Sequence, residues 1–258
     1  MDWIAYTSEL NGQGVQLLGF GDDALALEYF KVALETISYV ANACNENGGS
    51  VPKMMPPVPR NLHLVAPKTA SVGAPNLTPP MAATDAPQYR PHETESTSAA
   101  EPWIHSASVK NGGDNHFVYT KALTFTSTPV LSPANISFYI GVIEFNMGLT
   151  LHFLSRRLGE KFLFSALTVY DFSLEHIKNS GYGIECSKLL LFAALNNKAA
   201  LLYDLSSYET ARDVLTSLLD SIHNCKKAGI LSSIDDQDLE GFLFNVMLLR
   251  GATIAPAA

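Results

Sequence analysis

The distribution of proline divides this chain of 258 residues into regions of different character. Eleven of its fourteen prolines lie between Pro52 and Pro102, in a stretch that is also rich in Ala, Ser and Thr and poor in large aliphatic residues. Each proline removes a backbone donor, and a segment with little apolar surface cannot offset the entropy that is lost on ordering. We therefore expect residues 45–114 to be a disordered insertion, so that the fold is built from the flanking sequence.

The flanking sequence has apolar residues at three- and four-residue spacing, which is typical of helices. A Gly-Phe-Gly break at residues 19–21 separates the first two helices, so residues 1–44 are expected to form a helical hairpin. Two further hairpins and a capping helix follow in residues 135–250, and residues 251–258 remain as a flexible tail. The expected helices run over residues 9–18, 22–43, 135–155, 162–178, 186–203, 208–227 and 236–250. The prediction is an all-α fold.

Residues 115–134 lie between the insertion and the second hairpin, and their pattern is different. Their first part, His116–Phe125 (HFVYTKALTF), is rich in aromatic and β-branched residues in partial alternation. This composition predicts an extended conformation. We expect the extended segment to pack along the surface of the helices that follow it.

Small residues recur at fixed spacing in the hairpins. In the first hairpin, Gly14 is followed by Ala26 twelve positions later and by Phe30 sixteen positions later. Small residues at facing points let two helices approach to about 8–10 Å, and the large residue fills the groove between them. The same offsets relate Ala199, Ala211 and Leu215 and, with about six extra residues in the turn, Gly148, Ala166 and Tyr170.

These residues resemble the tetratricopeptide repeat (TPR) family, whose unit is a pair of antiparallel helices of about 34 residues. The text DDALALEYFKVALE at residues 22–35 is similar to the second helix of that unit, and LNNKAALLYDLSSYETA at residues 195–211 resembles the variant of kinesin light chains. The likeness covers residues 8–40 and 135–225. It departs from the family pattern at Gln13, Asp23, Lys198 and Leu218. The resemblance implies a short TPR-like solenoid of stacked hairpins.

The resemblance also implies a function. Stacked hairpins present a concave groove that binds segments of other proteins, so we expect a non-catalytic adaptor for a partner peptide. Asn146 and Asn197 stand at matching places beside Gly148 and Ala199, and an asparagine amide can pair with both the donor and the acceptor of a peptide backbone. The expected peptide-binding residues are Asn146, Asn197, Phe145, Leu149, His152, Phe153, Asn196 and Tyr203.

Other interpretations of the same residues stay open. Both asparagines could be solvated polar residues beside a packed seam, and the phenylalanines could belong to the core. The aromatic-rich segment before Asn135 could fill the protein's own groove, which would make the chain a self-occluded structural domain. The chain also resembles a set of uncharacterised proteins through FN-x-x-L-x-x-H at residues 145–152 and NV-x-LLR at residues 245–250. That likeness implies no activity.

An enzyme is the weaker class on these motifs. Four of the seven histidines lie in the insertion or just after it, and the other three lie on different predicted helices without HExxH or His-x-His spacing. The three cysteines are far apart and form no CxxC pair. We expect no metal ion and no cofactor. The alternative is a helical enzyme or small-ligand-binding protein with its site around Glu144 and His152.

Charge and hydropathy limit the partners and the compartment. A formal net charge of −8 disfavours nucleic acid and anionic membranes, which need a basic surface, and favours a neutral or basic protein partner. Residues 136–154 are apolar enough to span a membrane, but they contain Glu144, Asn146 and His152, so we expect a buried helix. No signal peptide is visible, which predicts a cytoplasmic or nuclear protein.

Overall fold

The computed structural model describes residues 3–46, 104–108, 118–125, 133–180 and 184–252. These ranges belong to one compact unit, which comprises residues 1–58 and 102–258, and a second unit at residues 59–101 lies wholly outside the described residues. Most of the predicted insertion, residues 45–114, therefore lies outside them as well. The same holds for residues 253–258 of the predicted tail.

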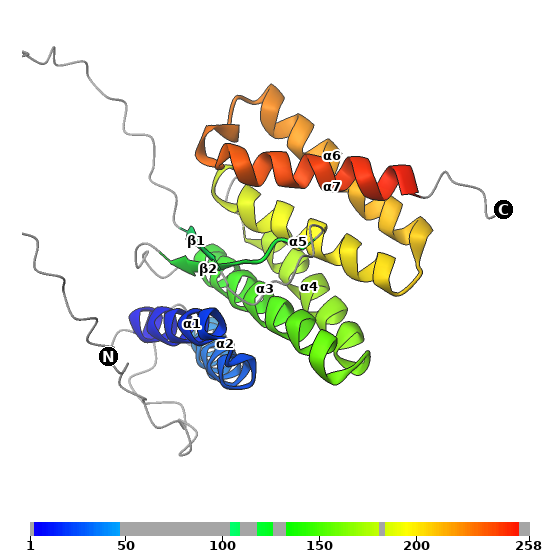
Figure 1. Cartoon of the computed structure of the whole chain (residues 1–258). Coiled ribbons are helices and arrows are strands. Elements are labelled where there is room, and N and C mark those ends of the chain that lie inside the picture. The colour runs from blue at the N-terminus through cyan, green and yellow to red at the C-terminus, as the bar shows by residue number, and fades with distance from the viewer. Residues whose placement is uncertain (1–2, 47–103, 109–117, 126–132, 181–183, 253–258) are drawn as a thin grey trace, which may run out of the picture. The chain divides into compact units, whose positions relative to one another are not determined.

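Seven α-helices make up most of the described chain (Figure 1), which confirms the all-α prediction. They are α1 (Trp3–Phe20), α2 (Asp23–Glu46), α3 (Pro133–Leu158), α4 (Lys161–Asn179), α5 (Ile184–Asp204), α6 (Tyr208–Lys227) and α7 (Asp236–Ala252), with a 3₁₀ turn at Leu231–Ser233. Helix α1 begins six residues before its predicted start. Trp3 and Ile4 continue its apolar face, and both are almost fully buried.

Consecutive helices pair along the chain. Helix α1 packs on α2, α3 on α4 and α5 on α6, and each hairpin meets the next through α2 with α3 and through α4 with α5. The first helices of the hairpins also touch in order, α1 with α3 and α3 with α5, and α5 touches α7 (Figure 1). These contacts place α1, α3, α5 and α7 next to one another in a row.

Two of the hairpins close where a glycine faces an aromatic ring. A Cβ atom added at Gly14 of α1 would lie 2.6 Å from the ring of Phe30, and one added at Gly148 of α3 would lie 2.7 Å from the ring of Tyr170. No side chain larger than hydrogen fits at either place unless the ring moves. The alanines predicted to face the partner helix, Ala26, Ala166 and Ala211, are 0%, 0% and 2% exposed.

The first and third hairpins turn in the same way. Each has one residue with positive φ, Gly21 at 83° and Ser206 at 59°. In each hairpin, the N–H of this residue donates to the carbonyl three positions earlier, and the next N–H donates to the carbonyl five positions earlier. This is the Schellman ending of a helix, so the two turns are equivalent in backbone geometry as well as in sequence offset.

The middle hairpin differs from the other two in the length of its helices. Its turn contains Gly159, with φ of 103°. Helix α3 extends ten residues beyond Gly148, whereas α1 extends six beyond Gly14, and α4 begins five residues before Ala166, whereas α2 begins three before Ala26. The six extra residues therefore lengthen the two helices, and the prediction that they enlarge the turn is wrong. Their helical extension continues regular backbone hydrogen bonding, which a longer loop would give up.

A two-stranded antiparallel sheet accompanies the helices. Strand β1 (Ile104–Ser108) pairs with β2 (Lys121–Phe125), with Ile104 opposite Phe125 and Ser108 opposite Lys121. The prediction of disorder is wrong for residues 104–108, because this backbone finds a partner in β2 and Ile104 is 4% exposed. The predicted extended segment, residues 115–134, is described at residues 118–125 and is a strand at residues 121–125. Helix α3 already begins at Pro133.

Helix α3 is apolar because other elements surround it. Its stretch Asn135–Leu158 is long and apolar enough to cross a membrane, and among the described helices it alone has this property. However, 94% of its most apolar window is buried inside the fold, against α2, α4, α5 and β2. Packing therefore accounts for its hydropathy, as expected of a core helix.

Candidate peptide-binding groove

The residues Val118–Phe125, here called the groove segment, run across the row of helices α1, α3, α5 and α7. Side chains from all four helices bond to the segment, those of α5 and α7 near its start and those of α1 and α3 near its end. Its buried residues are Val118, Tyr119, Ala122 and Leu123, at 7%, 8%, 0% and 0% exposure. The chain itself therefore occupies most of the space between these helices.

Asn146 of α3 holds the backbone of Leu123. The Leu123 N–H donates to Asn146 Oδ1 at 2.9 Å, and Asn146 Nδ2 donates to the Leu123 carbonyl at 2.8 Å. Asn11 of α1 donates a second hydrogen bond to the same carbonyl at 3.0 Å and accepts one from Asn146 Nδ2 at 2.9 Å. Asn11 and Asn146 are both fully buried, so this group of amides depends on Leu123 to satisfy its hydrogen bonds.

Asn197 of α5 holds Tyr119 in the same way. The Tyr119 N–H donates to Asn197 Oδ1 at 2.7 Å, and Asn197 Nδ2 donates to the Tyr119 carbonyl at 3.0 Å. Asn197 is in turn supported by the hydroxyl of Tyr170 at 3.2 Å and by Asn196 Nδ2 at 3.2 Å. Asn196 accepts a hydrogen bond from Asn245 of α7 at 2.8 Å, so the group of amides that holds Tyr119 extends across two helices, α5 and α7.

Asn146 and Asn197, here called the asparagine clamps, bind the backbone of two residues that are four positions apart. In an extended chain, alternate residues present their N–H and C=O groups to the same side, so Tyr119 and Leu123 face the asparagines while Ala122 and Thr124 can pair with β1. Asn146 and Asn197 each stand two positions before the small residue of their helix, Gly148 and Ala199. Consecutive hairpins therefore offer the same backbone-binding group at the same place.

Side chains of the groove segment also contact the helices, through ring packing, a hydrogen bond and an ion pair. The ring of Tyr119 packs against the rings of Phe242 and Phe145, with centroids 5.2 and 6.4 Å away, and its hydroxyl lies 3.2 Å from Oδ2 of Asp238. Lys121 Nζ lies 2.5 Å from Oδ1 of the same carboxylate. Burial raises the pKa of Tyr119, and the nearby Asp238 charge raises it further. Tyr119 therefore stays neutral and acts as a hydrogen-bond donor.

The groove segment does not fill the space beside α7. A cavity of about 180 Å³ lies between residues 118–121 of the segment and the side chains of Asn196, Gln237, Asp238, Phe242 and Asn245. Gly241 borders it, and a Cβ atom added there would meet nothing within 4 Å. The α7 end of the groove can therefore accept larger side chains than those of the segment.

The structure brings only part of the predicted site together. Asn146, Asn197 and Phe145 contact the groove segment, and Asn196 supports Asn197 from behind. The predicted Leu149, His152 and Phe153 are buried at 0%, 0% and 3% exposure. The ring of Tyr203 packs edge-on against Tyr208 of α6, with centroids 5.0 Å apart.

Sequence reasoning missed several residues that contact the segment. Asn11 stands three positions before Gly14, as Asn196 stands three before Ala199, so the repeat offsets already contained this signal. Asn245 opens the NV-x-LLR motif at residues 245–250, which carried no structural interpretation. No sequence pattern distinguishes Asp238 and Phe242 on α7 as contacts of the segment, because their contacts depend on where α7 packs against α5.

Glu144 and His152, proposed as an alternative site, have different neighbours. The Glu144 carboxylate lies 2.8 Å from Nδ1 of His176 on α4. Burial raises the pKa of Glu144, and the hydrogen bond to Glu144 raises the pKa of His176. The buried acid of α3 is therefore paired with His176.

His152 is fully buried, and neither ring nitrogen has a hydrogen-bond partner in the part of the chain that the structure describes. Burial lowers the pKa of His152 to about 3. The imidazole is therefore neutral near pH 7, and its 3.9 Å approach to Asp204 is not an ion pair under these conditions. A neutral, unpartnered ring with this pKa is poorly suited to acid–base chemistry near neutral pH.

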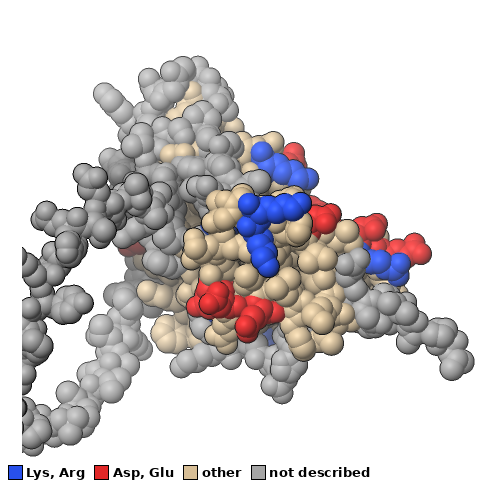
Figure 2. Space-filling model, turned by 90° about the horizontal axis from the view of Figure 1, so that it is seen from above, with Lys and Arg blue, Asp and Glu red and all other residues tan. Residues whose placement is uncertain are grey.

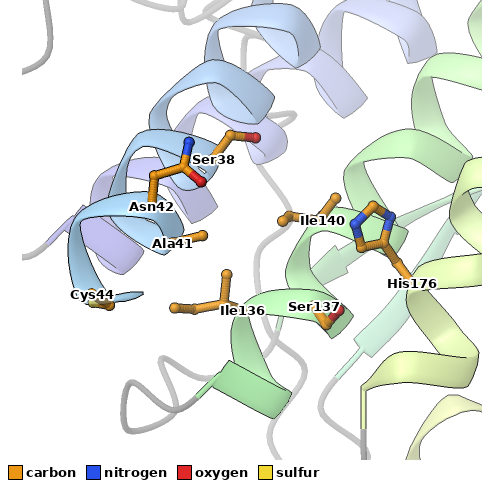
Figure 3. A pocket seen from close by; sticks show the side chains of 8 residues that line it. All are labelled: Ser38, Ala41, Asn42, Cys44, Ile136, Ser137, Ile140 and His176. Atoms are coloured by element: carbon orange, nitrogen blue, oxygen red, sulfur yellow. The ribbon is translucent and has the colours of Figure 1, made fainter. Parts of the chain in front are cut away.

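His176 also borders an open pocket of about 360 Å³ between α2, α3 and α4 (Figure 3). Ser38, Asn42 and Ser137 give it polar groups, and Ile136 and Ile140 give it apolar ones. Cys44 and His176 lie at opposite sides of this pocket in Figure 3, so they do not form a nucleophile–base pair there.

Charges are dispersed on one face of the molecule. On the face seen in Figure 2, basic and acidic side chains lie in small separate groups on a mostly uncharged surface. No group of three His, Cys, Asp or Glu side chains that could hold a metal ion occurs within the described ranges. The continuous basic surface that nucleic acid requires is not seen on this face.

No protein-family model matches the chain, and no curated protein or solved structure matches it either. The groove is therefore interpreted from its own contacts.

Proposed function

We propose that this protein is a non-catalytic interaction module in which stacked TPR-like hairpins bind an extended peptide of a partner protein. In this proposal, the groove across α1, α3, α5 and α7 is the binding site, and the groove segment occupies it in the absence of the partner. Equivalent close contacts at Gly14 and Gly148, and equivalent turns at Gly21 and Ser206, support a repeated hairpin unit.

The pair of asparagine clamps carries the proposal. Asn146 and Asn197 each satisfy the N–H and the C=O of one residue, at distances between 2.7 and 3.0 Å. Backbone groups are common to every peptide, so such clamps bind an extended chain without regard to its sequence. A peptide from another protein can make the same four bonds.

A structural role for the groove segment is the second candidate. Ala122 and Leu123 are 0% exposed, so loss of the segment would uncover apolar core as well as the clamps. Under this alternative the segment is a permanent part of the fold and no partner replaces it. The two candidates differ in one respect, which is whether the segment can be exchanged for a peptide in trans.

Competition between the segment and a peptide tests this difference. The probe is a fluorescent synthetic peptide with the sequence of residues 118–125, VYTKALTF. It is titrated into the full-length chain and into a full-length variant in which Tyr119→Ala and Leu123→Ala weaken the segment. We expect saturable binding to the variant, at least about tenfold tighter than to the unchanged chain, because occupation in cis lowers apparent affinity.

Two controls make the result specific. Adding Asn146→Ala and Asn197→Ala to the weakened variant should abolish binding, and adding Asn224→Ala, an exposed residue of α6, should leave it unchanged. A weakened variant that keeps its helical circular dichroism but binds no peptide contradicts the proposal. A weakened variant that loses its helical signal contradicts it too, because the segment would then be indispensable to the fold.

A further inference from the structure

We infer that the groove selects a peptide with a tyrosine, a basic residue two positions later and a large aliphatic residue two positions after that, and that Asp238 is the specificity-determining residue. This inference rests on the proposed function. It assigns the chemistry of the partner, which the asparagine clamps leave undetermined because they contact backbone alone. The groove segment itself has this pattern in Tyr119, Lys121 and Leu123.

Asp238 is a buried carboxylate, and both of its oxygens bond to the groove segment. Its side chain is 7% exposed, Oδ2 accepts from the Tyr119 hydroxyl, and Oδ1 lies 2.5 Å from Lys121 Nζ. A buried charge is costly unless it is paired and hydrogen-bonded. An occupant that lacks either partner would leave this carboxylate unsatisfied, so Asp238 penalises such peptides.

The spacing of these side chains follows from the extended backbone. Tyr119 and Lys121 are two positions apart, as are residues on one face of an extended chain, and one carboxylate on α7 bonds to both side chains. The Tyr119 ring also lies against Phe242 of α7 and Phe145 of α3. The site for the first side chain is therefore aromatic around the ring and acidic at its tip, which fits tyrosine better than phenylalanine.

Leu123 defines the third position of the pattern. It is 0% exposed, and its backbone is fixed by Asn146, so its side chain is enclosed by the fold, where an aliphatic residue is favoured. The cavity of about 180 Å³ beside residues 118–121 leaves room near the second position, so arginine can replace lysine there. A basic partner segment also agrees with the formal net charge of −8 of the chain.

A reciprocal charge exchange tests the inference. The full-length chain with Tyr119→Ala and Leu123→Ala is titrated with VYTKALTF and with VYTEALTF, in which glutamate replaces the lysine. We expect the lysine peptide to bind at least about tenfold more tightly, and we expect Asp238→Lys in the same chain to reverse the preference. Asp236→Lys, at an exposed position of the same helical turn, should preserve the original preference.

A second variant and a second peptide keep the test decisive if Asp238→Lys does not fold. Asp238→Asn retains a hydrogen-bond acceptor but removes the charge, and it should bring the two peptides to within about threefold of each other. The peptide VFTKALTF, which lacks the tyrosine hydroxyl, should bind the unchanged Asp238 site several-fold more weakly.

The outcomes separate the inference from the proposed function. Clamp-dependent binding with equal affinity for the lysine and glutamate peptides overturns the role of Asp238 and leaves the peptide-binding function standing. Absence of saturable binding for every peptide overturns both. A reversed preference in the charge exchange establishes the selection of a basic residue by Asp238.

Discussion

Five buried asparagine side chains form two connected groups beneath the groove segment. Asn11 and Asn146 make one group, and Asn196, Asn197 and Asn245 make the other. Buried amides are costly unless their donors and acceptors are paired. Because the segment supplies the bonds at the centre of each group, an empty groove would need water or another peptide in its place.

Substitution of the clamps should therefore destabilise the protein. We expect Asn146→Ala and Asn197→Ala each to lower the free energy of unfolding by roughly 1–3 kcal/mol. Asn146→Ala removes the partner of the buried Leu123 N–H and one of the two donors to the Leu123 carbonyl, and Asn197→Ala removes the bonds to the N–H and C=O of Tyr119. Urea denaturation followed by circular dichroism measures this. Asn224→Ala, on the exposed face of α6, should change stability by less than about 0.5 kcal/mol. Equal losses at all three positions would refute the clamp geometry.

The buried imidazole of His152 should make the protein sensitive to acid. Its pKa is about 3 in the folded chain and about 6.5 in an unfolded one, so the unfolded state binds a proton that the folded state refuses. Stability from this group is complete above pH 6.5 and is lost as the pH falls toward 3, by at most about 1.4 kcal/mol per pH unit.

His152→Leu should remove this contribution, because leucine does not titrate and replaces an unpartnered ring. The free energy of unfolding of this variant should fall less steeply between pH 6.5 and pH 3 than that of the unchanged chain, as measured by urea denaturation at several pH values. Asn224→Ala, which changes no titratable group and lies at an exposed position of α6, should keep the original slope. The same slope in all three proteins would show that His152 binds a proton as readily in the folded state as in the unfolded one.

Asn146 and Asn197 could be predicted from sequence because of their place beside Gly148 and Ala199. The offsets do not indicate their ligand, because they describe how helices pair and contain no information on what lies across them. The composition of the segment before Asn135 does indicate it, as the alternative in which this segment fills the protein's own groove, and Tyr119 and Leu123 of that segment bond to the two asparagines. The solvated alternative for these two residues is wrong, since both are 0% exposed. Phe145, Leu149 and Phe153 are buried as core residues would be, and Phe145 also touches the groove segment through Tyr119.

At the scale of elements, the hairpins depend on close contact between a small residue and a large one. Gly14 meets Phe30 and Gly148 meets Tyr170, and these rings are 0% exposed. The helices were predictable because their apolar spacing is regular. The lengths of α3 and α4 were not, because a six-residue insertion reads equally well as a longer loop or as longer helices until tertiary packing decides.

Two glycines of α1 offer a matched test of the contact between α1 and α2. Gly14→Ala should destabilise the chain by roughly 1–3 kcal/mol, because its Cβ would lie 2.6 Å from the Phe30 ring. Gly12→Ala should stabilise it by roughly 0.5–1 kcal/mol, because a Cβ there meets nothing within 4 Å and alanine is the better helix former. Thermal and urea unfolding measure both. Effects of the same sign would contradict the assigned facing of α1 and α2.

At the scale of the whole molecule, one compact unit contains all the described elements, although a long insertion separates its first hairpin from the rest. Composition places an insertion at residues 45–114, most of which lie outside the described residues. It could not predict that Ile104–Ser108 would form β1, because that strand is specified by its partner β2 and not by its own neighbours in sequence.

Removal of residues 59–101 tests the independence of the described unit. We expect the free energy of unfolding to change by less than about 1 kcal/mol, because loop length enters the closure entropy only logarithmically. A longer deletion, residues 59–108, also removes β1 and should cost measurably more. Loss of helical circular dichroism after the shorter deletion would show that the insertion is needed for folding.

Amide hydrogen exchange of Tyr119 and Leu123 in the full-length chain tests the central claim most directly, since these two N–H groups donate to Asn197 and Asn146. We predict that both are protected, that Asn197→Ala accelerates exchange at Tyr119 more than at Leu123, and that Asn146→Ala does the opposite. Exchange of both amides in the unchanged chain at the rate of an unstructured peptide would contradict the account.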